Sequence, residues 1–164
     1  MATKLRTYIT YRGGADAKAR GLPKALKDIL RDAVSMWHRD YLKFHFGTQS
    51  SVEARYPGIY KKRTAKYMRR KAAKYGHQNA LQYSGRTKIE VSSFITISGT
   101  SKNATGRMRG ANRALNFGDG VSKPDMRKEL LIVAHVEAAD LAQFVQAQVE
   151  EFLNKKDEVH TTEV

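Results

Sequence analysis

The sequence predicts an α+β protein, with a small antiparallel sheet, helices packed on one face of it, and a long basic glycine-rich loop. Three observations lead to this prediction. Apolar residues recur at every second position in several short segments, a pattern typical of half-buried strands. In two longer segments they recur at three- and four-residue steps, the period of an amphipathic helix. Five of the twelve glycines lie between residues 99 and 124, where neither period is visible.

The N-terminal third of the chain is expected to form one strand and one long helix. Alternating apolar residues predict a strand at residues 5–11, which a pair of glycines then ends. The apolar face of residues 22–46 predicts a helix that includes Trp37, and Pro23 suits its first turn. Trp37 lies on the apolar face, so it is expected in the core. Residues 48–55 are predicted to be a polar link.

The next helix, predicted at residues 60–75, combines aromatic and cationic side chains. At 100° per residue its basic side chains fall on one arc of roughly 140°. These residues are Lys62, Arg63, Lys66, Arg69, Arg70 and Lys74. The tyrosines at positions 60, 67 and 75 fall on the other side and are expected to pack inward. Lys61 and Lys71 land among the apolar residues and are expected to extend their amines outward to solvent.

The C-terminal half completes the predicted sheet and adds a last helix. Alternation over residues 89–98 predicts a strand with a bulge near Ser92 and Ser93. Residues 99–124 are predicted to form a long loop that carries Arg107, Arg109 and Arg113. Residues 126–134 are expected to be another strand, and residues 141–153 a helix. The whole would form one domain over residues 1–154, with a polar tail at 155–164.

The charge is strongly basic and unevenly distributed. The chain has a net charge of +14, and residues 54–89 include eleven basic residues and no acidic one. Lys62, Lys66, Arg70 and Lys74 form an unbroken series of like charges at four-residue steps, which costs the helix on the order of 1 kcal/mol with no acid to relieve it. We therefore expect an anionic partner, either nucleic acid or an acidic protein surface, such as one supplied by the net-negative residues 125–164 of a sister subunit. A merely solvated face is the remaining alternative. The predicted polyanion or subunit contacts are Lys62, Arg63, Lys66, Arg69, Arg70, Lys74, Arg107, Arg109 and Arg113.

No catalytic centre, cofactor or metal is predicted. Without cysteine the sequence offers no disulfide, thiolate metal ligand or cysteine nucleophile. His38 and His45 could share a helix face, but no third metal ligand accompanies them. Asp125 and Glu129 resemble half of a nuclease carboxylate motif that lacks its lysine partner, so metal-dependent hydrolysis stays a minor alternative. The N-terminal residues contain no apolar run typical of a signal peptide, and we expect a protein made in a cytoplasm, with no membrane contact.

A series of short motifs resembles the tail-completion or virion-morphogenesis proteins of tailed bacteriophages. Trp37, Phe44 and Phe46 precede the basic helix, and the stretch Leu81-Gln82-Tyr83-Ser84-Gly85-Arg86 follows it. In that family such a turn opens a hairpin, Asn116-Phe117-Gly118 matches an aromatic-glycine turn, and residues 124–131 match a closing strand. Tyr83 stands where the family commonly has aspartate, and Thr87 where it commonly has leucine.

The resemblance implies a structural virion protein that completes the tail and joins it to the head connector, in a homo-oligomeric ring around the DNA channel. A hexamer or dodecamer would then assemble in the bacterial host cytoplasm, beside other neck and tail proteins and with non-specific contact to genomic DNA. Two other hypotheses stay open. One is a stand-alone basic nucleic-acid-binding module, and the other is a nuclease.

Overall fold

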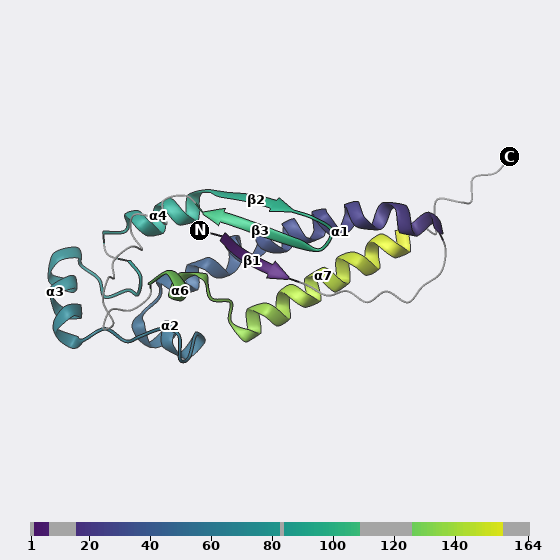
Figure 1. The fold of residues 1–164 in the computed structure, drawn as a ribbon. Coiled ribbons are helices and arrows are strands. Elements are labelled where there is room, and N and C mark those ends of the chain that lie inside the picture. The colour runs from purple at the N-terminus through teal and green to yellow at the C-terminus, as the bar shows by residue number, and fades with distance from the viewer. Residues whose placement is uncertain (1, 7–15, 83, 109–125, 156–164) are drawn as a thin grey trace.

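The computed structural model describes residues 2–6, 16–82, 84–108 and 126–155, which form a mixed α+β fold with a helical majority (Figure 1). The predicted fold class is confirmed. The strands are β1 (Ala2–Arg6), β2 (Ile95–Gly99) and β3 (Asn103–Met108). The helices are α1 (Asp16–Met36), the π-helical η1 (Trp37–Tyr41), the 3₁₀ segment η2 (Leu42–Phe46), α2 (Gln49–Arg55), α3 (Ala65–Tyr75), α4 (Arg86–Ser93), α6 (Met126–Leu131) and α7 (His135–Lys155).

The sheet is a small antiparallel one in the order β1-β3-β2, with β3 in the centre. Buried Ala104, Gly106 and Met108 alternate along β3 with more exposed neighbours, so one face of the strand meets the core. A side chain at Gly106 would place its Cβ 2.9 Å from Val34 of α1 and 2.6 Å from Ile95 of β2. The small residues of β3 therefore allow α1 to approach the sheet closely.

Helix α1 lies between the sheet and α7 and contributes to contacts with both. Leu30, Ala33, Val34 and Trp37 are almost fully buried, which confirms the predicted core position of the tryptophan. They join apolar residues of η2, β3, α6 and α7 in one core cluster. A smaller cluster gathers beside it around Val52, Tyr56, Tyr60, Ala80 and Ala134.

The carboxylate of Glu137, at the start of α7, is fully buried and accepts four hydrogen bonds. Trp37 Nε1 donates at 3.1 Å, Tyr56 OH at 2.7 Å, and the backbone N–H of Ala134 at 3.1 Å. Arg55 Nε donates at 2.7 Å and supplies the opposite charge. Burial and the hydrogen bond to Glu137 raise the pKa of Tyr56, so its hydroxyl stays a donor. Glu137 thus joins η1, α2 and α7.

The boundaries of the N-terminal elements differ from those predicted. Of the strand predicted at residues 5–11, the structure describes only the part within β1, and residues 7–11 lie outside the described ranges. The helix predicted at residues 22–46 begins earlier, at Asp16, and changes to π- and 3₁₀-helical turns after Met36. The predicted polar link is helix α2, which Thr48 caps by accepting a bond from the Ser51 N–H at 3.3 Å.

The prediction of a strand at residues 89–98 is wrong for its first half, because residues 89–93 belong to helix α4. Gly85 has φ of 83° and turns the chain into the helix, while Arg86 pairs with Glu90 one turn later. Ile89 is therefore 68% exposed while Val91 is fully buried, although both would lie on one face of a strand. The turn at Gly85 opens this helix, and the hairpin β2–β3 follows after it.

Two further predictions for the C-terminal half are corrected. Residues 126–131 of the expected strand 126–134 form helix α6, with the Ile132 N–H bonded to the Lys128 carbonyl at 3.1 Å. This helix departs from the closing strand that the phage resemblance implies. The loop predicted at 99–124 contains strand β3, and its residues 109–124 lie outside the described ranges. The predicted C-terminal helix is confirmed within α7.

The stretch Lys128–Asn154 is long and apolar enough to cross a membrane by length and composition alone. In the fold it is interrupted between α6 and α7 at residues 132–134, and its residues Leu141, Val145 and Val149 pack in the core with α1. Core packing against α1 is thus one role of its apolar composition.

We predict that Glu137→Gln lowers the free energy of unfolding by about 3 kcal/mol, because Arg55 then loses its buried counter-charge and the amide group cannot accept all four bonds. Urea denaturation followed by tryptophan fluorescence measures this loss. The matched variant Glu150→Gln, on the exposed side of α7, should change stability by less than about 0.5 kcal/mol. Equal effects of the two substitutions would contradict the role given to Glu137.

Candidate polyanion-binding site

The predicted cationic helix exists as α3, which lies at one end of the molecule, away from the sheet (Figure 1). Thr64 caps its N-terminus by accepting a hydrogen bond from the Tyr67 N–H at 3.3 Å. Gly76, with φ of 72°, ends it in the left-handed conformation and bonds to the Ala72 carbonyl at 2.8 Å. Met68 and Lys71 face inward.

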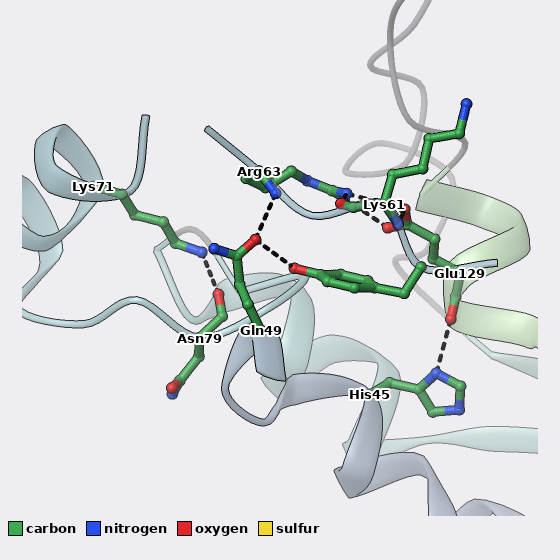
Figure 2. A network of polar contacts seen from close by, with 8 residues as sticks. His45, Gln49, Lys61, Arg63, Lys71, Asn79 and Glu129 are labelled. Atoms are coloured by element: carbon green, nitrogen blue, oxygen red, sulfur yellow. Dashed lines mark hydrogen bonds and ion pairs between the residues drawn. The ribbon is translucent and has the colours of Figure 1, made fainter. Parts of the chain in front are cut away.

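Helix α3 begins five residues later than predicted, and two side chains accept hydrogen bonds from the backbone N–H groups of the residues before it. Glu129 Oε1 accepts from the Lys61 N–H at 3.0 Å. Gln49 Oε1 accepts from the Arg63 N–H at 2.6 Å and from Tyr60 OH at 3.1 Å (Figure 2). Residues 61–64 form a non-helical link held by these two side chains. No signal in the sequence indicated that Gln49, in the predicted polar link 48–55, would bind this segment.

Arg63 belongs to the interior, in contrast to its predicted place on the cationic arc. Its guanidinium forms two bonds to the Glu129 carboxylate, Nη1 to Oε1 at 3.0 Å and Nη2 to Oε2 at 2.6 Å (Figure 2). The exposed fractions of the two side chains are 15% and 1%. Lys62 lies at the surface and pairs with Glu53 at 2.6 Å. Both residues thus have internal counterions and lie outside the helix, which corrects the predicted unbroken series.

Lys71 is buried as well, although its amine was expected to reach solvent. It is 5% exposed, and its Nζ donates to the backbone carbonyl of Asn79 (Figure 2). Burial, reinforced by the charge of Arg63, lowers the pKa of Lys71 to about 8. The lysine therefore ties α3 to the loop that follows it.

Four cations remain on the outer face of α3: Lys66, Arg69, Arg70 and Lys74. All four are exposed, and within the described ranges no ion pair joins any of them to an acidic residue. The Nζ of Lys74 lies 5.4 Å from the centre of the Tyr75 ring. At about 1.5 Å per residue the four charges span roughly 12 Å of helix. This outer face of α3 is the surface best suited to a polyanion.

The remaining predicted contacts lie elsewhere. Arg107 is exposed on β3, where its register partners are Ala2 and Thr96. It belongs to the sheet and not to α3. Arg109 and Arg113 lie outside the described residues. Tyr60 is buried as predicted, and burial raises its pKa to about 12, while Tyr67 and Tyr75 are half-buried.

The side chains considered for metal chemistry are already engaged by the protein. His38 Nε2 lies 2.7 Å from the Val91 carbonyl, and His45 Nδ1 lies 2.8 Å from the Glu129 carbonyl. Two bonds from Arg63 and one from the Lys61 N–H occupy the Glu129 carboxylate, so it is not presented to a metal ion. Its supposed partner Asp125 lies outside the described residues. The geometry around Glu129 thus argues against the nuclease hypothesis.

His45 is fully buried and packs between aromatic rings. It stacks on Tyr56 with ring centres 4.2 Å apart and meets Trp37 edge-on at 5.8 Å. Because a carbonyl must accept, Nδ1 is the donor, and Nε2 has no hydrogen-bond partner among the described residues. Burial lowers the pKa of His45 to about 4. The ring is therefore a neutral core residue.

No family model, curated protein or solved structure matches this chain.

We predict opposite outcomes for two arginines that the sequence placed on the same arc. Arg63→Ala should lower the free energy of unfolding by about 3 kcal/mol, because it leaves the buried Glu129 carboxylate without its counter-charge. Arg69→Ala should change it by less than about 0.5 kcal/mol, since its side chain is exposed. Chemical denaturation of both variants tests this contrast, and an Arg63→Ala protein as stable as Arg69→Ala would refute it.

We predict a stability loss on acidification that depends on His45. Its pKa in the folded protein, about 4, lies below the ordinary value of 6.5, so in this interval only the unfolded chain binds the extra proton. The free energy of unfolding should then fall as the pH drops from 6.5 towards 4, by about 2 kcal/mol between pH 7 and pH 5.

The variant His45→Asn is the control, because its amide keeps a donor near Nδ1 and does not titrate in this range. Urea denaturation of both proteins at pH 7 and pH 5 should show the larger loss in the protein with histidine. Equal losses would contradict the neutral buried state of His45.

Proposed function

We propose that this chain is a structural assembly protein of a bacteriophage virion, which completes the tail and joins it to the head connector in a homo-oligomeric ring around the DNA channel. The observation that carries the proposal is the outer face of α3. There Lys66, Arg69, Arg70 and Lys74 stand together, without acidic partners among the described residues. The sequence resemblance around Trp37 and residues 81–86 supports the phage context.

The arrangement favours a binding role for α3 over a catalytic one. Among the described residues, the two most buried carboxylates are those of Glu129 and Glu137, and each binds an arginine within the fold. The Arg63–Glu129 ion pair and the bond of Lys71 fix α3 from beneath. A cationic surface held in a fixed orientation can contact phosphates without reading bases, which suits a protein that surrounds DNA of any sequence.

The repulsion on this face also favours an anionic partner. Lys66, Arg70 and Lys74 succeed one another at four-residue steps, and each such like-charge pair costs a few tenths of a kcal/mol in an isolated helix. Phosphates, or the acidic side chains of an adjoining subunit, would remove this cost. A stand-alone nucleic-acid-binding module would use the same face, and it differs from the ring protein in its state of association.

We predict that Lys66→Glu with Arg70→Glu weakens binding to a fluorescent DNA duplex and lowers its salt dependence. Each phosphate contact adds about −0.9 to the slope of log K against log salt, so the slope should become shallower by about 2. The matched control is Lys24→Glu with Lys27→Glu, which changes the net charge equally on exposed positions of α1. Fluorescence anisotropy over a salt series measures both variants.

The state of association separates the two functions. Sedimentation of the wild-type protein should show a closed oligomer of hexamer or dodecamer mass if the ring proposal holds, and a small species that still binds DNA if the chain is a stand-alone module. Equal DNA affinity and equal oligomer mass in the α3 variant, the control and the wild type would refute the role of α3 in both functions.

A further inference from the structure

The inner side of α3 borders a small cavity into which two basic side chains reach. Its walls come from the segment before α3, the inner face of the helix, the loop after it and Met126. The basic side chains are those of Arg63 and Lys71, and none of the described residues that line the cavity is acidic. Its volume is about 40 Å³. This is about three times the space that one water needs, so the cavity has room for a single small ion but not for a nucleotide.

Lys71 brings a buried charge to this cavity without a carboxylate to balance it. The residue is 5% exposed, and its Nζ donates to the Asn79 carbonyl (Figure 2). In the described part of the chain no ion pair joins Lys71 to an acidic residue. An ammonium group has three N–H donors, so Lys71 keeps donors for a further acceptor. A buried charge is stable only with a counter-charge and satisfied hydrogen bonds, and here the counter-charge is missing.

Arg63 adds positive potential to the cavity. Its guanidinium is already held by the Glu129 carboxylate and the Lys61 carbonyl, so it is not the principal donor to a ligand. Burial, and then the charge of Arg63, lower the pKa of Lys71 to about 8, and most of the lysine is still charged at pH 7. An anion in the cavity would relieve both effects.

The loop after α3 supplies amide groups that can complete the coordination of an anion. Asn79 and Gln82 both line the cavity, and Asn79 Nδ2 lies 3.5 Å from Gln82 Oε1, at the limit for a hydrogen bond. Because this contact is long, either amide can turn an N–H group to a ligand at small cost. Between them Leu81 has φ of 48°, a left-handed conformation that concentrates at binding sites when a residue other than glycine adopts it.

We propose that this cavity binds one small oxyanion of the phosphate or sulfate type, with Lys71 as its principal ligand and the amides of Asn79 and Gln82 as further donors. The anion would supply the counter-charge that the fold withholds from Lys71, and it would join α3 to the loop that follows. The four cations on the outer face of α3 do not line this cavity. The inference therefore goes beyond the proposed function and does not rest on it.

Thermal denaturation of the full chain in sodium phosphate or sodium sulfate tests the site, with sodium chloride added to keep the ionic strength constant. At an anion concentration about ten times the dissociation constant, a ligand of the folded state alone should raise Tm by about 4 °C. Lys71→Met should abolish this shift, whereas Lys74→Met, at an exposed position of the same helix, should keep it. Equal shifts in the wild type and both variants would overturn the proposal.

A second variant is needed because Lys71→Met also removes the bond to Asn79. Gln82→Glu places a negative charge in the cavity itself, so this protein should have a higher Tm than the wild type without added anion and should no longer respond to the anion. Gln78→Glu, at an exposed position of the same loop, changes the net charge equally and should leave both properties unchanged. A Gln82→Glu protein that is less stable than the wild type, or that keeps the full anion shift, would contradict the site.

A short thymidine oligonucleotide in place of phosphate identifies the source of the oxyanion. Stabilisation that disappears in Lys71→Met would show that a nucleic-acid phosphate enters the cavity, and stabilisation by the inorganic anions alone would assign the site to a free ion. No shift with any of them would refute the inference. The variant Lys66→Glu with Arg70→Glu should keep the phosphate shift, so failure of this site and failure of the outer face of α3 are separate results.

Discussion

The buried carboxylate of Glu137 is the interaction on which the arrangement of the helices depends. It receives Trp37 from η1, Arg55 and Tyr56 from the end of α2, and the N–H of Ala134 just before its own helix. A buried charge is tolerated only when it is paired and fully hydrogen-bonded, so all four donors must be in place at the same time. The long α1–η1 helix and α7 are thereby aligned.

A second buried ion pair, between Arg63 and Glu129, positions α3, as Glu137 positions the helices of the core. It holds the residues that precede α3, while Lys71 holds the helix from its inner side. Three of the basic residues in this region therefore contact Glu129, Glu53 and Asn79 within the fold. The outer four of α3, and the exposed Lys61 before the helix, are the ones available to a partner. The sequence therefore predicted too many binding residues, because it does not show which basic side chains are buried and which are exposed.

The sequence predicted what long periodic patterns determine and missed what depends on tertiary contacts. The fold class, the core position of Trp37 and the C-terminal helix follow from apolar periodicity. Short apolar runs do not separate strand from helix, and so residues 89–93 and 126–131 were misassigned. Strand β3 was missed because Ala104 and Gly106 are small where α1 approaches, which removes the alternation of large side chains. For the site, periodicity located Lys66, Arg69, Arg70 and Lys74, but it could not show that Glu129, far along the chain, neutralises Arg63.

The cationic surface of α3 is held in a fixed orientation by the fold. The Arg63–Glu129 ion pair positions α3, and the Arg55–Glu137 ion pair positions α2, which precedes it in the chain. Rigid placement of this kind reduces the entropy lost when a subunit joins an assembly. In the proposed ring, rotational symmetry would give every α3 the same orientation relative to the ring axis. Charge that is modest on one subunit would then become a continuous cationic band, which is the arrangement a ring needs to hold a polyanion of any sequence.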